Sequence, residues 1–294
     1  MSKRGFIFFI LLPIILLLAG SYFLLFSGST QQKKGDLAYF TPDTVPTNGG
    51  IVDERSLVEV PVLRSKQLKE NDTINRFTVN ITYPEVSLSG HPELATQANG
   101  IFKSFVDDQV AKYKRDMIED EKLPIPKDLS SDLTMGFTPL LISPTILSLR
   151  FDSSEYIAGA AHPDNKTQIV NYDMATKARI GTGDLFLSST TTLQFLSQFS
   201  RAALKSQLTD ITPEEYAKQV IPGTEPSVDN FENVGITEDG LVVIFNPYRV
   251  APYARGTIIV HIPFNTKGGE LDPMVVRAIR LAHENIVQGT PVEN

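Results

Sequence analysis

The 294-residue chain lacks cysteine, has few histidines and has no excess of basic residues. Without cysteine it can form no disulfide, thiolate nucleophile, cysteine-ligated zinc site or acylated lipoprotein anchor. Only four histidines remain to titrate near neutral pH. The formal net charge of −7 and the pI of about 5.2 argue against the basic face that nucleic-acid binders use, so we expect no nucleic-acid partner.

The N-terminus carries one long apolar run. Residues 5–26 are almost wholly apolar and follow Lys3 and Arg4. A helix of about 20 apolar residues spans a bilayer core of about 30 Å, and basic residues before such a span stay in the cytoplasm. We therefore predict a short tail and a transmembrane signal-anchor over residues 1–27, in a bacterial cell membrane, with the rest extracytoplasmic. The alternative is a cleaved signal peptide, whose apolar region is usually only about 7–15 residues long.

The composition becomes polar after the predicted anchor. From Ser27 to about Arg55 the chain is polar, rich in Gly, Pro, Thr and Asn, and without hydrophobic periodicity. Such a segment cannot bury enough apolar surface to offset the entropy of ordering its backbone. We assign residues 28–70 to a flexible stalk, 71–145 to a smaller α+β domain, and 146–294 to a larger α+β domain.

Local patterns predict the main elements of both domains. Period-2 alternation predicts a strand at 77–83, and apolar residues at helical spacing predict helices at 91–118, 190–208 and 272–287. Thr212 and Glu215 form a capping box that starts a short helix. Asp239-Gly240 predicts a hairpin joining 233–237 to 241–245. Because residues 241–245 are all apolar, we expect that strand to be covered on both faces, with a further strand at 257–262.

His162 is the most reactive side chain that the sequence offers. It lies in a Gly-Ala-Ala-His-Pro segment with Asp164 and Asp173 within chain reach, so it could act as a general base or a metal ligand. The alternative is structural, with the small residues allowing close backbone approach and the imidazole capping a loop. A metal site would need further ligands, and the other histidines lie in unrelated segments, so we expect neither metal nor cofactor.

The connection between the last two predicted strands carries the second candidate site. It holds four aromatic or basic side chains: Tyr248, Arg249, Tyr253 and Arg255. Tyr and Arg are enriched at the energetic centres of interfaces, so the loop is a candidate recognition surface. The alternative is that both rings fold back onto the strands beneath them.

Four short segments, each present once, follow one another along the chain. They are Tyr156-x-x-Gly159-Ala160-Ala161-His162-Pro163; Tyr172-Asp173 leading to Asp184-Leu185-Phe186; Asn230-Phe231 leading to Gly240-Leu241; and Tyr248-x-Val250-Ala251-Pro252-Tyr253-Ala254-x-Gly256 closing on Ile262-Pro263. Together they resemble the extracytoplasmic family of unknown function found at the C-terminus of the lysozyme-receptor anti-sigma factor RsiV. The match covers about residues 156–271, and residues 77–117 are similar to the smaller domain that often precedes it.

The resemblance implies an α+β fold, with an antiparallel sheet and helices packed on one side, in a cell-envelope protein. Two departures limit what it implies. Thr176 is followed directly by Lys177 where the family usually inserts a glycine. No anti-sigma domain precedes the apolar run, and the metal-binding Asp-Asp and His-x-x-x-His set of related polysaccharide deacetylases is absent, so neither activity carries over.

Three functions remain open. The leading hypothesis is an outward-facing binding module that contacts an envelope protein, such as a muramidase, or a glycan, and is not an enzyme. The second is an envelope hydrolase that uses His162 with Asp164 or Asp173. The third is a purely structural role in the envelope.

Overall fold

The computed structural model describes residues 59–120, 129–187, 189–267 and 269–287, all within one compact unit, Gly49–Asn294. The predicted anchor and most of the predicted stalk lie outside these residues. Among the helices that the structure describes, none is both long and apolar enough to cross a membrane.

The first part of the unit is a six-stranded sheet with strand order β1-β2-β3-β4-β5-β6. Neighbouring strands are antiparallel except β2 and β3, which are parallel and are joined through the long helix α2. The elements are β1 (Val62–Asp72), β2 (Phe77–Ser87), α2 (Pro92–Asp120), β3 (Ser131–Ile142), β4 (Ile146–Tyr156), β5 (Asp164–Asp173) and β6 (Ala178–Ile180).

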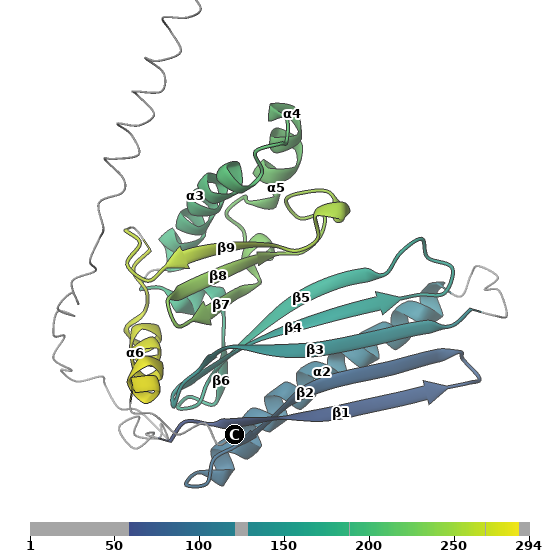
Figure 1. Cartoon of the computed structure of the whole chain (residues 1–294), viewed down its shortest axis with the longest axis horizontal. Helices are drawn as coiled ribbons and strands as arrows, with labels where there is room; N and C mark the ends of the chain where they lie inside the picture. The colour runs from purple at the N-terminus through teal and green to yellow at the C-terminus, as the bar shows by residue number, and fades with distance from the viewer. Residues whose placement is uncertain (1–58, 121–128, 188, 268, 288–294) are drawn as a thin grey trace, which may run out of the picture. The chain divides into compact units, whose positions relative to one another are not determined.

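Helix α2 packs along one face of this sheet (Figure 1). Alternate residues of β2, among them Val79 and Ile81, point to the helix, where they join Phe102 and Phe151 in a closed core. The intervening residues of the same strands therefore point to the opposite face. The apolar spacing that predicts a helix at 91–118 is confirmed.

A second, three-stranded antiparallel sheet follows, with strand order β7-β8-β9. Helices α3 and α6 share its core. The elements are η2 (Thr182–Leu185), α3 (Ser189–Gln207), α4 (Pro213–Glu215), η3 (Tyr216–Val220), α5 (Ile221–Gly223), η4 (Asp229–Phe231), β7 (Val234–Thr237), β8 (Gly240–Phe245), η5 (Tyr253–Arg255), β9 (Ile258–Pro263) and α6 (Pro273–Val287). The Asp-Gly hairpin and the Thr212–Glu215 capping box are confirmed.

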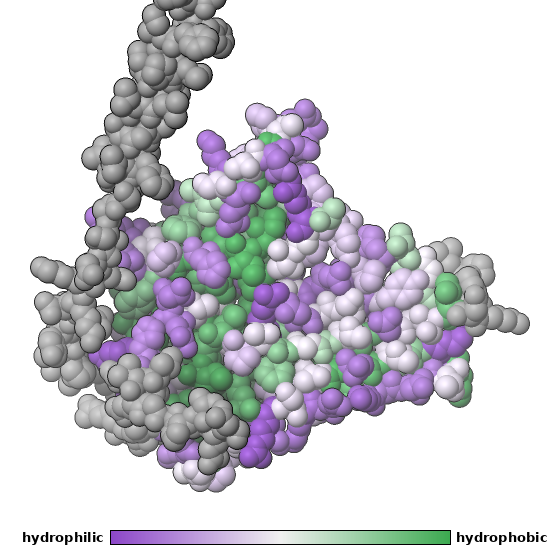
Figure 2. Space-filling model, in the orientation of Figure 1, coloured by the Kyte–Doolittle hydropathy of each residue, from purple (hydrophilic) through white to green (hydrophobic). Residues whose placement is uncertain are grey.

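Strand β8 is buried on both faces, as its composition predicts. Leu241 and Val243 pack into the core shared with the helices, whereas Val242 and Ile244 pack with Ile169 of the large sheet. In Figure 2 the apolar side chains gather over α3, β8 and β9 and near β6, while the broad end of the large sheet at β3–β5 is white and purple.

Buried polar side chains tie the two sheets together. The Asn171 amide donates to the Val234 carbonyl (2.8 Å), and the Ile236 N–H donates to the Ser148 hydroxyl (3.0 Å). Nearer the loop after β8, the Asn246 side chain accepts from the Thr167 N–H (2.7 Å) and donates to the Thr167 carbonyl (3.0 Å). Asn246 thereby pairs with the backbone of β5 as a strand residue would.

The structure confirms the α+β class and corrects its details. One sheet is mixed, because the crossover through α2 allows a parallel pair, and a second sheet packs on the face opposite α2. The predicted division at 145/146 falls within the β3–β4 hairpin, so the large sheet continues across it. Residues 62–70, assigned to the stalk, form most of β1, an edge strand whose charged residues hide its periodicity.

Candidate functional site

The loop between β8 and β9, residues 246–257, is called the aromatic loop below. Its middle is held in the core by Val250 and Ala251, which are buried. It also lies directly on the end of α5, where a Cβ added to Gly223 would be 1.9 Å from the Arg249 carbonyl oxygen. With Asn246 fixed on β5, the loop is held at its start and its centre.

Three rings from two distant segments meet on this loop, and we call them the aromatic cluster. His162, just before β5, stacks on Tyr253 with ring centroids 4.1 Å apart and planes 27° apart. The Tyr248 ring lies 5.4 Å from the Tyr253 ring, and its hydroxyl is 3.4 Å from His162 Nε2. The Tyr253 hydroxyl donates to the Pro163 carbonyl (2.8 Å). The histidine segment and the loop, both singled out in the sequence, therefore form one surface.

The hydrogen bonds of His162 define its tautomer. Nδ1 lies 2.8 Å from the Pro163 carbonyl oxygen, which can only accept, so Nδ1 carries the proton. In the neutral imidazole Nε2 is then an acceptor, 3.4 Å from the Tyr248 hydroxyl. Among the described residues no carboxylate contacts the imidazole, and no group of three or more His, Asp or Glu side chains is arranged to hold a metal ion.

The two aspartates proposed as partners of His162 lie at opposite ends of β5. Asp164 begins the strand and pairs with Lys166. Asp173 ends it, about 30 Å away at 3.3 Å per residue. There the buried Asp173 carboxylate accepts from the Ala175 N–H and the Thr176 hydroxyl, both at 2.8 Å, and shapes the β5–β6 turn. The structure does not bring His162 and Asp173 together.

The two arginines of the loop point to different neighbours. Arg249 lies 3.8 Å from Glu232 and donates to the Asn230 side-chain oxygen at 3.3 Å. Arg255 pairs with Asp210, and this hydrogen bond holds the pKa of the Asp210 carboxyl below its usual value. Arg249 thus belongs to the exposed site, whereas Arg255 ties the loop to the segment before α4.

A groove of about 640 Å³ runs between α2, the ends of β4 and β5, and the aromatic loop. Tyr248 and Arg249 form part of its wall. We call it the charged groove, because its lining includes three basic and three acidic side chains: Lys112, Lys166, Arg249, Glu155, Asp164 and Glu232. Burial raises the pKa of the Glu155 carboxyl, against the opposing effect of Lys112 and Lys166.

Most residues of the charged groove carry no signal in the sequence. Lys112 lies in the charged end of a helix, and Glu155 and Glu232 are isolated acidic residues. The groove forms because the second sheet docks on the large one and brings the aromatic loop to the edge of β5. Only Tyr248, Arg249 and Asp164 were singled out from local composition.

Comparison with known proteins shows that part of the chain is similar to a protein family. Residues 183–265 match the model described as "Protein of unknown function (DUF3298)". The matched residues contain α3, the second sheet and the aromatic loop, but neither His162 nor the large sheet. The finer resemblance to the RsiV C-terminal region stays an expectation.

Two solved structures of DUF3298 proteins share the fold. One, from Bacteroides fragilis NCTC 9343, is 22% identical with a TM-score of 0.54, covering 76% of this chain and 98% of that one. The other, from Pseudomonas aeruginosa PAO1, is 14% identical with a TM-score of 0.53, covering 75% and 98%. Because these similarities extend well beyond residues 183–265, the large sheet is part of the shared fold.

One characterised protein is also similar to part of the chain. The peptidoglycan-N-acetylmuramic acid deacetylase PdaC of Bacillus subtilis (strain 168) is 24% identical over 149 residues. These residues are 51% of this chain and 31% of PdaC, so the chain spans less than a third of that relative's length.

Proposed function

We propose that the chain is a membrane-anchored, extracytoplasmic binding module whose aromatic loop recognises a protein of the cell envelope. The observation that carries the proposal is the aromatic cluster. His162 comes from one segment and Tyr248 and Tyr253 from another, the three rings contact one another, and Tyr248 also lines the charged groove. Clustered tyrosines beside an arginine are typical of the energetic centre of a protein interface.

The conformation of Tyr248 supports binding over a purely structural role. Its side chain is 66% exposed, so it contributes little to the core. Its backbone is left-handed, with φ of 70°, which costs a residue other than glycine roughly 1–2 kcal/mol. A strained and exposed aromatic residue on an otherwise anchored loop is a recurrent feature of ligand-binding sites.

The charged groove indicates what kind of partner fits. Its basic and acidic side chains are balanced and alternate with amides, which suits a polypeptide surface that carries both signs of charge. A muramidase is one such envelope protein. The name of the similar Bacillus deacetylase also places that relative at the peptidoglycan, which supports a role in the envelope for this chain.

The alternative of hydrolysis by His162 finds little support in the geometry. Both imidazole nitrogens have neighbours, one a backbone carbonyl and the other a tyrosine hydroxyl. A general base needs a third group that orients it and a nucleophile within reach. Asp164 is paired with Lys166, and Asp173 lies at the far end of β5, so neither carboxylate of the hydrolase hypothesis orients the imidazole.

Quantitative capture from envelope extracts tests the proposal. The full-length chain in lipid nanodiscs is compared with Tyr248→Gly, which removes the ring and relieves the backbone. We expect at least one envelope protein to be captured by the wild type and to be lost with the variant. The control is Ile74→Ala, which removes an even more exposed apolar side chain, from the β1–β2 turn.

The result that would contradict the proposal is equally clear. If wild type, Tyr248→Gly and Ile74→Ala capture the same proteins in the same amounts, the aromatic loop is not a recognition surface. Activity against peptidoglycan that depends on His162 but not on Tyr248 would instead favour the hydrolase.

A further inference from the structure

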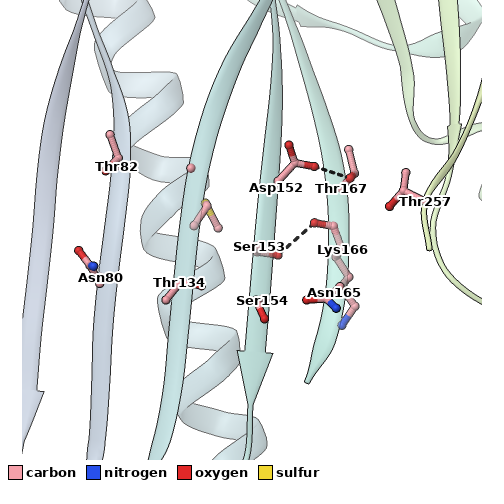
Figure 3. Close-up of a pocket in the computed structure, with 12 residues that line it drawn as sticks. Asn80, Thr82, Thr134, Asp152, Ser153, Ser154, Asn165, Lys166, Thr167 and Thr257 are labelled. Carbon is pink, nitrogen blue, oxygen red and sulfur yellow. Dashed lines mark hydrogen bonds between the residues drawn. The ribbon is translucent and has the colours of Figure 1, made fainter. Parts of the chain in front are cut away.

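A second hollow lies on the other face of the large sheet, away from α2. It encloses about 410 Å³, within the range of small-ligand sites. Figure 3 shows its side chains standing on four adjacent strands in front of α2, with Thr257, the last residue of the aromatic loop, on the side of β5. We call this hollow the polar trough.

The strand register aligns polar side chains in a row on the floor of the polar trough. Asn80 pairs with Thr134 across β2 and β3, Thr134 pairs with Ser154, and Ser154 pairs with Asn165. Paired residues point to the same face, and neighbouring strands lie about 4.8 Å apart. The row therefore presents hydroxyl and amide groups at regular steps close to the length of one pyranose ring.

These side chains are available to a ligand. Within the described residues, the side chains of Asn80, Thr134 and Ser154 make no hydrogen bond to the protein. Asn165 differs, since its amide donates to the Tyr253 hydroxyl (2.7 Å) and so joins the end of the row to the aromatic cluster. The row thus offers free donors and acceptors along its length and an aromatic ring at one end.

Gly136 occupies the middle of β3 in the polar trough, and the fold does not require a glycine there. A Cβ added at this position would meet nothing within 4 Å, and its φ is not in the left-handed region. Glycine weakens a strand interior, and besides bulges and bends it is found where a ligand or another backbone approaches closely. The register shift in the β3–β4 pair lies farther along, between Pro139 and Leu141.

Among the described residues, the lining of the polar trough also holds no charged side chain without an ion-pair partner. Its two charged residues are both paired, Asp152 with Arg150 and Lys166 with Asp164. Asp152 accepts in addition from the buried Thr167 hydroxyl at 2.6 Å. An uncompensated charge on a ligand would therefore find no partner, whereas a ligand rich in hydroxyl and amide groups would find many.

We propose that the polar trough binds an uncharged glycan, laid across β2–β5 over Gly136 along the row Asn80, Thr134, Ser154 and Asn165. The polar trough lies on the face of the large sheet away from α2 and adjoins the protein-binding surface, since Ser153, Asn165 and Lys166 line both hollows. The chain then has two ligands, a polypeptide at the charged groove and a saccharide on the opposite face of the sheet.

Calorimetric titration with a soluble oligomer of β-1,4-linked N-acetylglucosamine tests this site. The full-length chain is used in lipid nanodiscs, because detergents with sugar headgroups would compete. We expect saturable binding that Thr134→Val weakens about fivefold by removing one hydrogen bond. Gly136→Thr fills the hollow and should abolish binding, although threonine suits a strand better than glycine and keeps the protein folded.

Matched variants separate the trough from the rest of the sheet. Thr138→Val makes the same change on the same strand and face, outside the lining, and should bind as wild type. The proposal is overturned if the wild type shows no binding at an oligomer concentration of about 10 mM, because the Kd would then lie above the millimolar range. It is also overturned if Gly136→Thr binds unchanged, or if an anionic hyaluronan oligomer binds more tightly.

Discussion

The two ends of β5 show how this fold divides its polar residues between stability and recognition. At one end Asp173 is 3% exposed, and neighbouring N–H and hydroxyl groups saturate its carboxylate. At the other end Asp164, Asn165 and nearby His162 are exposed and contact the aromatic loop or the charged groove. The same strand therefore carries a structural carboxylate and a candidate binding site, and burial distinguishes them.

The largest loss of stability is expected for a substitution at the buried end of β5. Asp173→Ala leaves the N–H groups of the β5–β6 turn without their acceptor, which should lower the free energy of unfolding by roughly 3 kcal/mol. Urea denaturation measures this loss. Asp164→Ala, at the exposed end, should change stability by less than about 0.5 kcal/mol. Equal losses of stability in the two variants would contradict the division of β5 into a structural end and an exposed end.

A smaller loss is expected where the second sheet joins β5. Asn246→Ala removes both hydrogen bonds to the Thr167 backbone, for about 1–2 kcal/mol. Because Asn246 also begins the aromatic loop, amide hydrogen exchange should rise in residues 247–257 more than in β8. Uniform exchange across both segments would show that Asn246 does not anchor the loop.

At Tyr248 the expected stability change has the opposite sign. Glycine adopts a φ of 70° without strain, so Tyr248→Gly should keep or raise the unfolding free energy, by up to about 1 kcal/mol. The thermal midpoint reports this change. A clear loss of stability would mean that the ring serves the core, contrary to its exposure.

The smallest effect concerns pH. Burial in the charged groove raises the pKa of Glu155 above its usual value of 4.5, so the folded state holds this proton more tightly than the unfolded state. Stability from this group is present below pH 4.5 and is lost as pH rises through the raised value. Glu155→Gln should flatten that part of the stability profile, and an unchanged slope would place Glu155 in solvent.

Local patterns in the sequence were sufficient where the structure is local. The helix at α2 follows from apolar spacing, the β7–β8 hairpin from Asp-Gly, and the double burial of β8 from its unbroken apolar run. Strand β1 was missed because an edge strand is kept soluble by charged residues, which resemble a stalk in composition.

The site depends on contacts that no local pattern encodes. The His162 segment and the aromatic loop were each singled out, but their stacking depends on the docking of two sheets through Asn246 and Asn171. The pairing of His162 with Asp173 was predicted from their short distance in sequence. An extended strand separates the two residues in space. The polar trough depends on strand register and on the position of the aromatic loop, since its residues come from four strands and from Thr257.

The affinity of Tyr248→Gly for a captured envelope protein, measured beside its unfolding midpoint, decides most directly whether the exposed end of β5 is a recognition surface. We predict a loss of binding of at least about tenfold, the scale of an interface hot spot, with a midpoint equal to or above that of the wild type. Unchanged affinity in this folded variant would contradict the proposal.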